Sequence, residues 1–479
     1  MKLALINTPY QHVYVKMSSG KNSNFPLGLG YIASYVRQFG HKVQLFDPEA
    51  AGYSFESLYD KLDKFKPDLI GIHSVSMNYP LVKQIANGIR DNGYKGVVIY
   101  GGVHASAMPK VILDEVQAID VVAVGEGEFT TRELLDALAD KSEDWSAING
   151  IYYRRGDEIL RTPRRSFEDD VDQFPFPARD LVNLDNYRLH AHYSRGLKSV
   201  TMLSSRGCPS ACTFCANLLT MGRRFRVHSI DYFIKEIKHL KEQYNIEVFQ
   251  FVDDLFMADI DRCKAICRRM IAEKLNIRWL IFGRVDSLDY ESIKLMKEAG
   301  CYFILFGMES GNNEILKKIG KNTTKDQARK AIAICNEVGI QSFNSFIIGN
   351  TGETHETAMD TVNFARELPS TFASFNIMVP FVGTPLFKHF YSDSMGKIDN
   401  WQNWGLMSED FSVQPLHTEL SNKELRQYIV KGYRKFYFRP SQIWRVIKSI
   451  ESFAHFMVFL KGFVGMLQQV FLWSGKKEN

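Results

Sequence analysis

The sequence predicts an α/β protein in which two parallel sheets follow one another and a helical region closes the chain. Two observations predict the sheets: short apolar runs alternate with amphipathic stretches in the first 140 residues, and the same alternation resumes after residue 199. A third observation, the helical pattern that replaces such runs late in the chain, predicts the last region. We expect a first domain at 1–140, a linker at 141–198, a barrel-like core at 199–390 and a helical region at 391–479.

The first domain is expected to be a doubly wound parallel sheet. A helical pattern at Leu29, Ile32, Ala33 and Val36, stopped by Gly40, is typical of the helices that cover such a sheet. The expected strands are the apolar runs 3–7, 43–47, 69–73, 97–100 and 121–124.

Ligands of such sheets bind at the carboxyl ends of the strands, where this chain places glycines and small polar side chains. Glycine lets a large or phosphate-bearing ligand approach the backbone, although a glycine after a strand is often only a turn. No G-x-G-x-x-G follows the first strand, which disfavours a dinucleotide. The candidates at these strand ends are Asn7, Pro9, Ser74, Ser76, Gly101, Gly102, His104, Gly125 and Glu126.

The linker carries a hairpin signal at 150–160 and a proline-rich run at 172–180, which favours an extended path between domains. Beyond it, six strand-like runs with helices between them predict a partial (β/α)6 barrel, whose chemistry would lie on the loops after the strands. The six runs are 199–204, 248–252, 279–282, 303–306, 342–348 and 374–379.

Acidic and basic residues follow several of these strands. Asp253, Asp254, Arg284 and Glu309 are candidate contacts for a charged cofactor. An acidic residue in such a loop can instead cap the next helix; we prefer the functional role for Asp253 and Glu309, and leave both roles open for the acidic residues at positions 286 and 353.

Three cysteines after the first strand of the barrel are the most informative feature of the chain. Cys208, Cys212 and Cys215 are spaced C-x3-C-x2-C, with Phe214 before the last. Three thiolates can hold three irons of a [4Fe–4S] cube and leave the fourth iron open. A four-cysteine zinc site would need a second C-x2-C nearby. The other cysteines, Cys263, Cys267, Cys301 and Cys335, are expected to be small buried hydrophobes.

The cysteine pattern resembles the radical S-adenosylmethionine (SAM) superfamily, in which SAM occupies the open iron. Ser74 and Ser76 followed by Gly101 and Gly102 resemble the cobalamin-binding domain that precedes many radical SAM cores, and 349–354 and 380–386 resemble motifs of the same family. The resemblance implies a Rossmann-like cobalamin domain, a TIM-type barrel, and a [4Fe–4S] cluster, SAM and cobalamin as cofactors. The D-x-H-x-x-G motif after strand one is absent, which implies cobalamin without a histidine ligand; His12 and His104 could still approach the corrin.

The resemblance further implies an enzyme that cleaves SAM reductively to a 5′-deoxyadenosyl radical. It would be a methyltransferase that methylates an unactivated carbon of an unknown small-molecule substrate through methylcobalamin. Two alternatives stay open: a cobalamin-containing cyclase or rearrangement enzyme without methyl transfer, and a non-enzymatic iron–sulfur or corrinoid binding module. An electron donor such as flavodoxin or ferredoxin is an expected partner.

Composition excludes some classes and leaves one question about the tail. A net charge of +5 over 479 residues does not favour a nucleic-acid partner, and the start of the chain predicts a strand and not a signal peptide, so we expect a cytoplasmic protein. Helices are expected at 421–438 and 440–473; the second is interrupted by polar residues, so docking on the protein is expected and peripheral membrane contact is the alternative. The aromatic residues Trp401, Trp404 and Phe411 could close the barrel mouth or merely pack.

Overall fold

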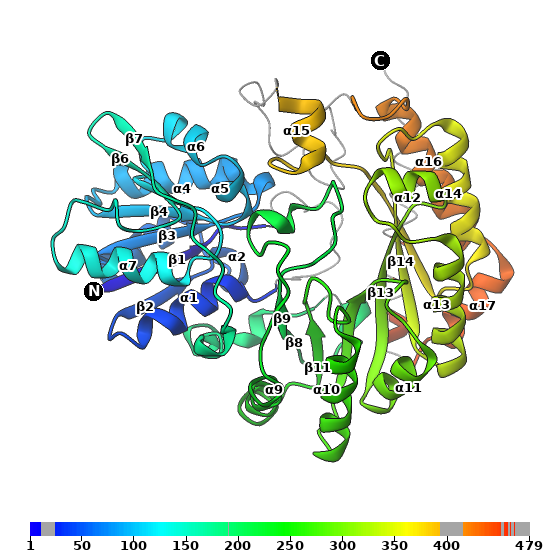
Figure 1. Ribbon diagram of the computed structural model, residues 1–479. Helices are drawn as coiled ribbons and strands as arrows, with labels where there is room; N and C mark the ends of the chain where they lie inside the picture. The colour runs from blue at the N-terminus through cyan, green and yellow to red at the C-terminus, as the bar shows by residue number, and fades with distance from the viewer. Residues whose placement is uncertain are drawn as a thin grey trace.

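The computed structural model consists of two α/β lobes side by side (Figure 1), and it describes residues 1–10, 24–189, 191–392, 415–451, 455–457, 460 and 464. His12, the aromatic residues Trp401, Trp404 and Phe411, and most of the expected last helix lie outside these residues. No helix in the described part of the chain is long and apolar enough to cross a membrane.

The first lobe contains a seven-stranded sheet in the order β2-β1-β3-β4-β5-β6-β7. The first five strands of that order pair in parallel, as expected, and the order in which strands are added to the sheet reverses between β1 and β3. The strands are β1 (Lys2–Asn7), β2 (Lys42–Phe46), β3 (Leu69–His73), β4 (Val97–Gly101), β5 (Val121–Ala123), β6 (Ile151–Arg155) and β7 (Glu158–Arg161).

The hairpin expected in the linker forms, and it belongs to the first sheet, because β6 pairs antiparallel with both β5 and β7.

Apolar residues cover both faces of this sheet. Leu3 and Leu5 face one buried cluster with α1, while Ala4 and Ile6 face another with α3 and α4. The helices are α1 (Leu27–Arg37), α2 (Pro48–Ala51), α3 (Phe55–Phe65), α4 (Tyr79–Asp91), α5 (Val103–Ala107), α6 (Pro109–Glu115) and α7 (Glu128–Ala139).

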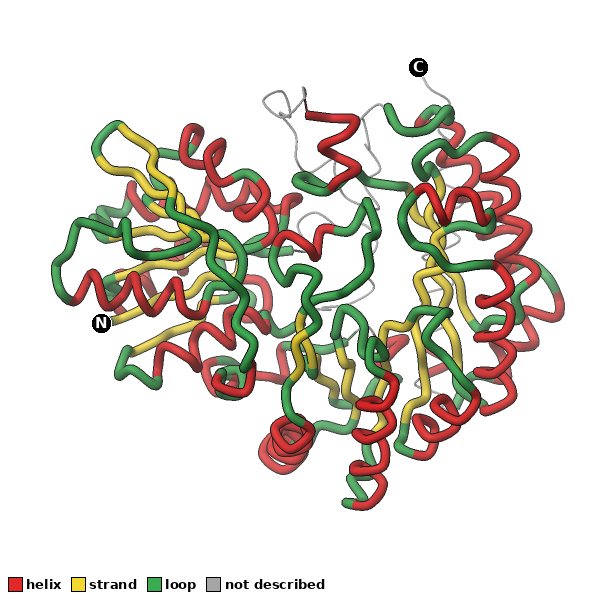
Figure 2. Tube along the Cα trace, in the orientation of Figure 1, coloured by secondary structure: helices red, strands yellow, loops and turns green. Residues whose placement is uncertain are grey.

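The second lobe contains the expected open barrel of six parallel strands, in the order β15-β14-β13-β12-β11-β8 (Figure 2). Because β8 and β15 stand at opposite ends of this order, the sheet is curved but not closed. The strands are β8 (Ser199–Met202), β11 (Val248–Phe251), β12 (Arg278–Gly283), β13 (Cys301–Glu309), β14 (Gln341–Ile348) and β15 (Phe372–Ile377).

Helices cover the outer face of this barrel. Phe249, Phe251 and Trp279 pack there against helical residues such as Cys263 and Cys267, and the four cysteines expected to be buried hydrophobes are indeed buried. The helices are α8 (Ala191–Ser194), α9 (Ile230–Tyr244), α10 (Ile260–Ala272), α11 (Tyr290–Glu298), α12 (Asn313–Lys318), α13 (Lys325–Val338), α14 (His355–Glu367), α15 (Pro385–Tyr391), α16 (Asn422–Tyr437) and α17 (Pro440–Lys448).

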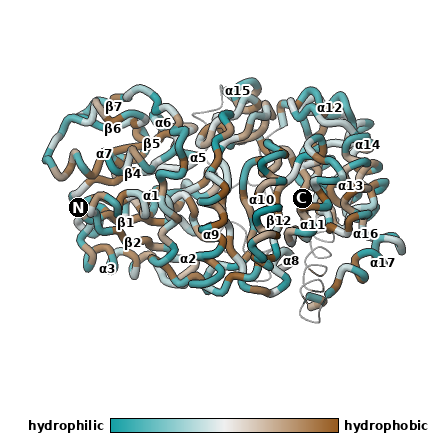
Figure 3. Tube along the Cα trace, turned by 60° about the horizontal axis from the view of Figure 1, so that its bottom comes forward, coloured by the Kyte–Doolittle hydropathy of each residue, from teal (hydrophilic) through white to brown (hydrophobic). Residues whose placement is uncertain are grey.

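The C-terminal helices follow the expectation in part. Helix α16 begins after Ser421, whose side chain forms a capping box with Glu424. Helix α17, at the periphery of the second lobe (Figure 3), ends at Lys448, so the expectation of one helix from 440 to 473 is wrong. The hydroxyl of Ser449 donates to the carbonyl of Val446 at 2.6 Å, a local bond that competes with continuation of the helix.

Candidate functional site

The three cysteines lie on one loop between two short antiparallel strands, β9 (Ser205–Arg206) and β10 (Arg226–Val227). Gly207 begins the loop at φ +86°, where an added Cβ would lie 2.1 Å from the carbonyl oxygen of Arg224, so only glycine fits. The amide of Thr213, inside the motif, donates to the carbonyl of Ile319 at 2.9 Å, which holds the loop against the segment after α12.

The thiols are half-buried, free of disulfides and close enough to affect one another. Burial raises the pKa of Cys215 to about 11, and the neighbouring Cys212, Asp254 and Cys208 act in the same direction. The described residues hold no group of three His, Cys, Asp or Glu side chains placed around a single metal ion. A cube differs, since each cysteine binds a separate iron, and the donor set of three unbridged thiols on one loop fits it.

Two cationic residues lie near the cysteines. Burial raises the pKa of the Cys212 thiol, while the Lys321 ammonium and the Arg284 guanidinium act against this rise and so favour the thiolate. Arg284 forms an ion pair with Asp286 at 2.7 Å and donates to the carbonyl of Lys321 at 2.7 Å. The Arg284 guanidinium is therefore held beside the cysteine loop from the end of β12.

Glu309 lies in the same neighbourhood, at the end of β13. Its carboxylate accepts from Lys321 Nζ at 3.0 Å, and its backbone has φ +62°, an uncommon value for a residue other than glycine. The strand pairing with β14 is irregular between Gly307 and Glu309, and this bulge turns the Glu309 carboxylate toward Lys321.

The two aspartates after β11 play different roles. Asp253 is buried, and its carboxylate accepts from the amide and the hydroxyl of Ser204 and from the hydroxyl of Ser205. Asp254 accepts from the amide of Gly207 at 3.1 Å. Burial raises the pKa of Asp254 to about 6, because the effect of burial outweighs that of the hydrogen bonds from Asn217 and Gly207, which lower the pKa. Asp254 is thus beside the cysteine loop, while Asp253 supports the strand that leads into it.

Three further expectations have structural answers. Phe214 packs with Ile347, Met378 and Leu386, so its ring fills space between the cysteine loop and the barrel. The residues at 286 and 353 are not helix caps: Asp286 pairs with Arg284, and the buried Glu353 carboxylate accepts from the amides of Gly349 and Asn350. The capping role is taken by Asp289 and Thr354 instead.

In the first lobe, most of the candidate residues meet at the carboxyl edge of the sheet. Asn7 Nδ2 donates to Asp47 at 2.8 Å, and the carbonyl of Pro9 accepts from Asn78 at 2.6 Å. The hydroxyl of Ser74 shares a 2.7 Å hydrogen bond with Tyr100. These contacts fix the loops after β1 and β3 from within the protein.

The loop after β4 continues this edge. Ser76 Oγ lies 3.0 Å from Nδ1 of His104, a buried imidazole packed on Tyr79, and burial lowers the pKa of His104 to about 3. The imidazole of His104 therefore lies beneath the loop after β4 and is not exposed at its surface. Gly101, at the end of β4, stands beside His73 of β3 and precedes Gly102.

This edge fits a large ligand on two observations. Buried polar atoms of Thr8, His73 and Asn78, all beside the point where the strand order reverses, have no hydrogen-bond partner in the described part of the chain. Gly102 has φ +111°, and an added Cβ would lie 2.6 Å from the carbonyl oxygen of Ser74. Glycine there lets the loops after β3 and β4 pack closely together, and Gly125 in the next loop has open space beside its backbone, so the residues present fit the expected cobalamin.

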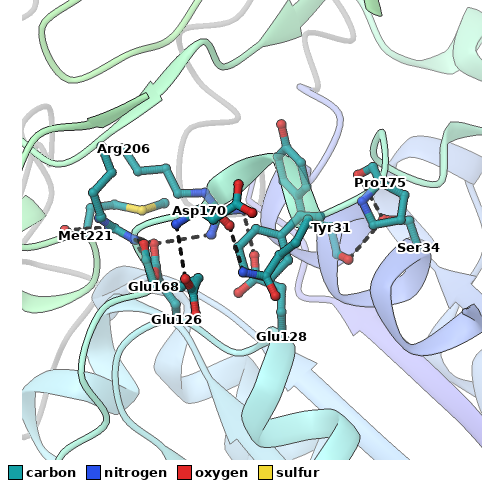
Figure 4. A network of polar contacts seen from close by, with 12 residues as sticks. Tyr31, Ser34, Glu126, Glu128, Glu168, Asp170, Pro175, Arg206 and Met221 are labelled. Atoms are coloured by element: carbon teal, nitrogen blue, oxygen red, sulfur yellow. Dashed lines mark hydrogen bonds and ion pairs between the residues drawn. The ribbon is translucent and has the colours of Figure 1, made fainter. Parts of the chain in front are cut away.

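The loop after β5 is engaged differently from the expectation. Gly125 has φ +90° and open space around it, and its amide donates to the hydroxyl of Ser106 at 3.0 Å. Glu126 lies 3.2 Å from Arg206 and 2.8 Å from Arg226, with Glu128 close by (Figure 4). Both oxygens of Glu126 are used by arginines, so a cofactor contact from this side chain would require the ion pairs to open.

The two candidate sites lie next to each other. Helix α5, which follows Gly102, contacts the short helical segment Ala216–Leu219, which begins directly after Cys215. At the same place an added Cβ on Gly383 would lie 3.0 Å from both Ala107 and Leu219. The edge of the first sheet and the cysteine loop therefore share one boundary between the lobes.

Sequence reasoning missed Arg206, Arg226, Glu128 and Lys321. Arg206 directly precedes the Gly-Cys that begins the cysteine loop, and it is buried among the aromatic rings of Tyr31 and Phe174. A cationic residue beside the motif was the only available signal, because its acidic partners are 78 to 80 positions earlier in the chain.

Comparisons with known proteins agree with this arrangement. The model of the radical SAM superfamily matches residues 202–365, and that of the B12 binding domain matches residues 17–135. The chain is 33% identical over 474 residues to an uncharacterized methyltransferase of Pyrococcus horikoshii, covering 98% of this chain and 99% of that protein. It is 26% identical over 425 residues to an anaerobic magnesium-protoporphyrin IX monomethyl ester cyclase of Cereibacter sphaeroides, covering 87% of this chain and 67% of that protein.

A solved structure has the same fold. It is that of the cobalamin-dependent S-adenosylmethionine radical enzyme OxsB with aqua-cobalamin and S-adenosylmethionine bound, at a TM-score of 0.75 and 19% identity. The match covers 98% of this chain and 72% of that chain. Both lobes of the fold are included in it.

Proposed function

The chain belongs to the cobalamin-binding radical SAM enzymes, and from this premise we propose that it methylates an unactivated carbon of a small-molecule substrate. Its cofactors are a [4Fe–4S] cluster, SAM and cobalamin. When bound, the cluster supplies the electron that cleaves SAM, and cobalamin supplies a carrier for a methyl group. The observation that carries the proposal is the shared boundary between the cysteine loop and the carboxyl edge of the first sheet, where α5 meets the segment after Cys215.

The cluster would be held by Cys208, Cys212 and Cys215. Their support is the free state of the thiols, the anchoring of the loop by Thr213 and Gly207, and the cationic residues beside Cys212. Thiolate is the form that binds iron, so a nearby positive charge favours loading.

Polar side chains around this loop would orient SAM. Asp254, Arg284 and Glu309 come from three successive strands and surround the cysteines, so they can bind the charged and hydroxyl groups of SAM by ion pairs and hydrogen bonds. Asp253 would act one step away, since its carboxylate fixes Ser204 and Ser205 and thereby the start of the loop. Phe214 would exclude water from the barrel side of the cluster, where it packs on Ile347 and Met378.

Cobalamin would lie over the edge formed by the loops after β1, β3, β4 and β5. Gly125 would let it approach the backbone, Gly102 lets the loops after β3 and β4 pack closely beneath it, and the unpartnered polar atoms near His73 offer hydrogen bonds to its amide groups. A ligand in this position would face the cysteine loop across the boundary between the lobes.

A cyclase or rearrangement enzyme without methyl transfer is the second candidate. The specific observation in its favour is the 26% identity to a magnesium-protoporphyrin IX monomethyl ester cyclase over 87% of this chain. A non-catalytic binding module, the third reading of the sequence, is not favoured, because the chain is a member of an enzyme family.

An electron donor such as flavodoxin or ferredoxin and a cytoplasmic location complete the proposal.

The C-terminal helix α17 is proposed to contact an anionic membrane surface. Helix α17 exposes about half or more of Ile443, Trp444 and Ile447, with Lys448 over the Trp444 ring at 5.2 Å. Sedimentation with anionic vesicles that is lost in Trp444→Ser/Ile447→Ser would support this contact, and a wild-type protein that stays in solution would end it.

One experiment separates the two enzymatic candidates without knowledge of the substrate. The anaerobically reconstituted protein is given hydroxocobalamin, SAM and a reductant, and the nucleoside products are separated. A methyltransferase forms S-adenosylhomocysteine that depends on cobalamin, in addition to 5′-deoxyadenosine. If cobalamin is bound and 5′-deoxyadenosine forms without S-adenosylhomocysteine, the result would favour a cyclase or rearrangement enzyme.

A further inference from the structure

The cysteine loop is closed at its base by two arginines. Arg206 and Arg226 are paired residues of the antiparallel strands β9 and β10, and the 19 residues between them include all three cysteines. Like charges directly opposite on neighbouring strands repel each other, and here both side chains are also buried. The base of the loop therefore depends on whatever neutralises these two charges.

The neutralising groups come from the other lobe. Glu126 contacts Arg226 at 2.8 Å and Arg206 at 3.2 Å, and Glu128 contacts Arg206 at 2.8 Å, so two carboxylates balance two guanidinium groups. Figure 4 shows the Arg206 side chain and the two glutamates turned toward one another. Both glutamates follow Gly125 at the carboxyl edge of the first sheet, Glu126 in the loop after β5 and Glu128 at the first position of α7.

Further contacts fix the arginines in place. The Arg206 guanidinium lies 4.8 Å from the ring centre of Tyr31 and 4.6 Å from that of Phe174, and Arg226 donates to the carbonyls of Met221 and Glu168. A planar guanidinium that is stacked and bidentate has little freedom, so movement of the glutamate loop would be passed to the base of the cysteine loop.

We propose that Arg206 and Arg226 are positioning residues that couple the two cofactor sites, so that cobalamin bound at the loop 125–128 tightens the binding of SAM at the cysteine loop. This inference rests on the proposed cofactor sites and goes beyond them, since it assigns a connection between the sites. A ligand that orders the loop after Gly125 fixes Glu126 and Glu128, and these fix the arginines. By thermodynamic linkage SAM must then tighten the binding of cobalamin by the same factor.

The test measures a ratio that a purely structural ion cluster would leave unchanged. The dissociation constant of labelled SAM is determined by anaerobic equilibrium dialysis on cluster-loaded protein, with and without saturating hydroxocobalamin. We expect cobalamin to lower the constant at least about fivefold in the wild type. In Glu126→Gln the ratio is expected to fall to about one, because one carboxylate cannot hold two buried arginines.

Two further variants keep the test decisive. Arg206→Lys keeps the charge but loses the planar fork and its stacking, so it should lower the ratio even if Glu126→Gln fails to fold. Asp180→Asn is the matched control, because it removes an exposed pair with Arg37 at 2.8 Å, outside both candidate sites, and should keep the wild-type ratio.

The outcomes distinguish this inference from the proposed function. A wild-type ratio of one, or an unchanged ratio in Glu126→Gln or in Arg206→Lys, would overturn the coupling while deoxyadenosine formation stays intact. Loss of deoxyadenosine formation in the wild type would instead overturn the proposed function. Neither binding measurement requires turnover or a known substrate.

Discussion

The guanidinium of Arg206 lies 2.8 Å from the carboxylate of Glu128, and both side chains are almost fully removed from water. Burial lowers the pKa of Arg206, but the charges of Glu128 and Glu126 outweigh it and raise the pKa above its ordinary value. Arg206 is two residues from Cys208, and Glu128 begins α7 in the other lobe. This ion pair fixes the base of the cysteine loop against the first lobe, and so fixes the position of one candidate site relative to the other.

Removal of one cysteine of the motif should remove the cluster. Cys208→Ala and Cys215→Ala are expected to lose most of the bound iron and all deoxyadenosine formation, because each variant leaves only two cysteine ligands for the [4Fe–4S] cluster. Cys301→Ala is the control: it removes a buried thiol on β13 and should cost about 1–2 kcal/mol of stability with iron retained. Iron and sulfide analysis after reconstitution would measure both, and full iron content in Cys208→Ala would contradict the assignment.

The second prediction concerns the close approach at Gly102. Gly102→Ala would bring a Cβ to 2.6 Å from Ser74 O and 3.0 Å from the His73 ring, so the loop must shift and cobalamin binding should fall at least about tenfold. Gly93→Ala also places a side chain at a positive φ, +87°, but with open space around it and away from the sheet's carboxyl edge, so it should bind cobalamin normally. Equal affinities of the two variants, measured by corrinoid absorbance after gel filtration, would contradict this role of Gly102.

The third prediction separates the support role of Asp253 from ordinary capping. Asp253→Ala leaves the donors of Ser204 and Ser205 buried without an acceptor, so the free energy of unfolding should fall by about 3 kcal/mol. Asp259, in the same loop, caps α10 by accepting from the amide of Arg262. Asp259→Ala should therefore cost only about 1 kcal/mol. Denaturant titration of both variants tests this, and similar losses would show that Asp253 gives no special support.

The fourth prediction is a dependence of stability on pH through Glu353. Burial raises the pKa of Glu353 to about 7 from 4.5, so the folded state holds its proton more tightly than the unfolded state. The contribution to stability is full below pH 4.5 and is lost as the pH rises to 7, by up to about 3 kcal/mol. Glu353→Gln should remove this part of the slope, whereas that of Glu236, also raised to about 7, remains in both proteins. Identical slopes between pH 4.5 and 7 in the two proteins would contradict the prediction.

The sequence alone predicted what depends on local pattern. The apolar runs of β1, β3 and β14 identify buried strands, because a buried strand needs only a few consecutive apolar residues. The spacing of Cys208, Cys212 and Cys215 is likewise a local property of one loop.

Features that depend on packing between distant segments could not be predicted. The partner of Arg206 is fixed by how the two lobes meet, and the partners of Asp253 by how β8 and β11 align. At the end of α17, after Lys448, the hydroxyl of Ser449 bonds to the carbonyl of Val446, a local contact that the apolar pattern of the segment does not reveal.

The most direct test of the central claim asks whether SAM binds the iron cluster held by the three cysteines. Reconstituted protein is reduced under anaerobic conditions and mixed with SAM labelled with nitrogen-15 at the amino group, and the cluster is examined by electron–nuclear double resonance. We predict about four irons per chain and a hyperfine coupling to the labelled nitrogen that is absent in Cys212→Ala. A loaded cluster without that coupling, or a chain that cannot be loaded with iron, would contradict the account.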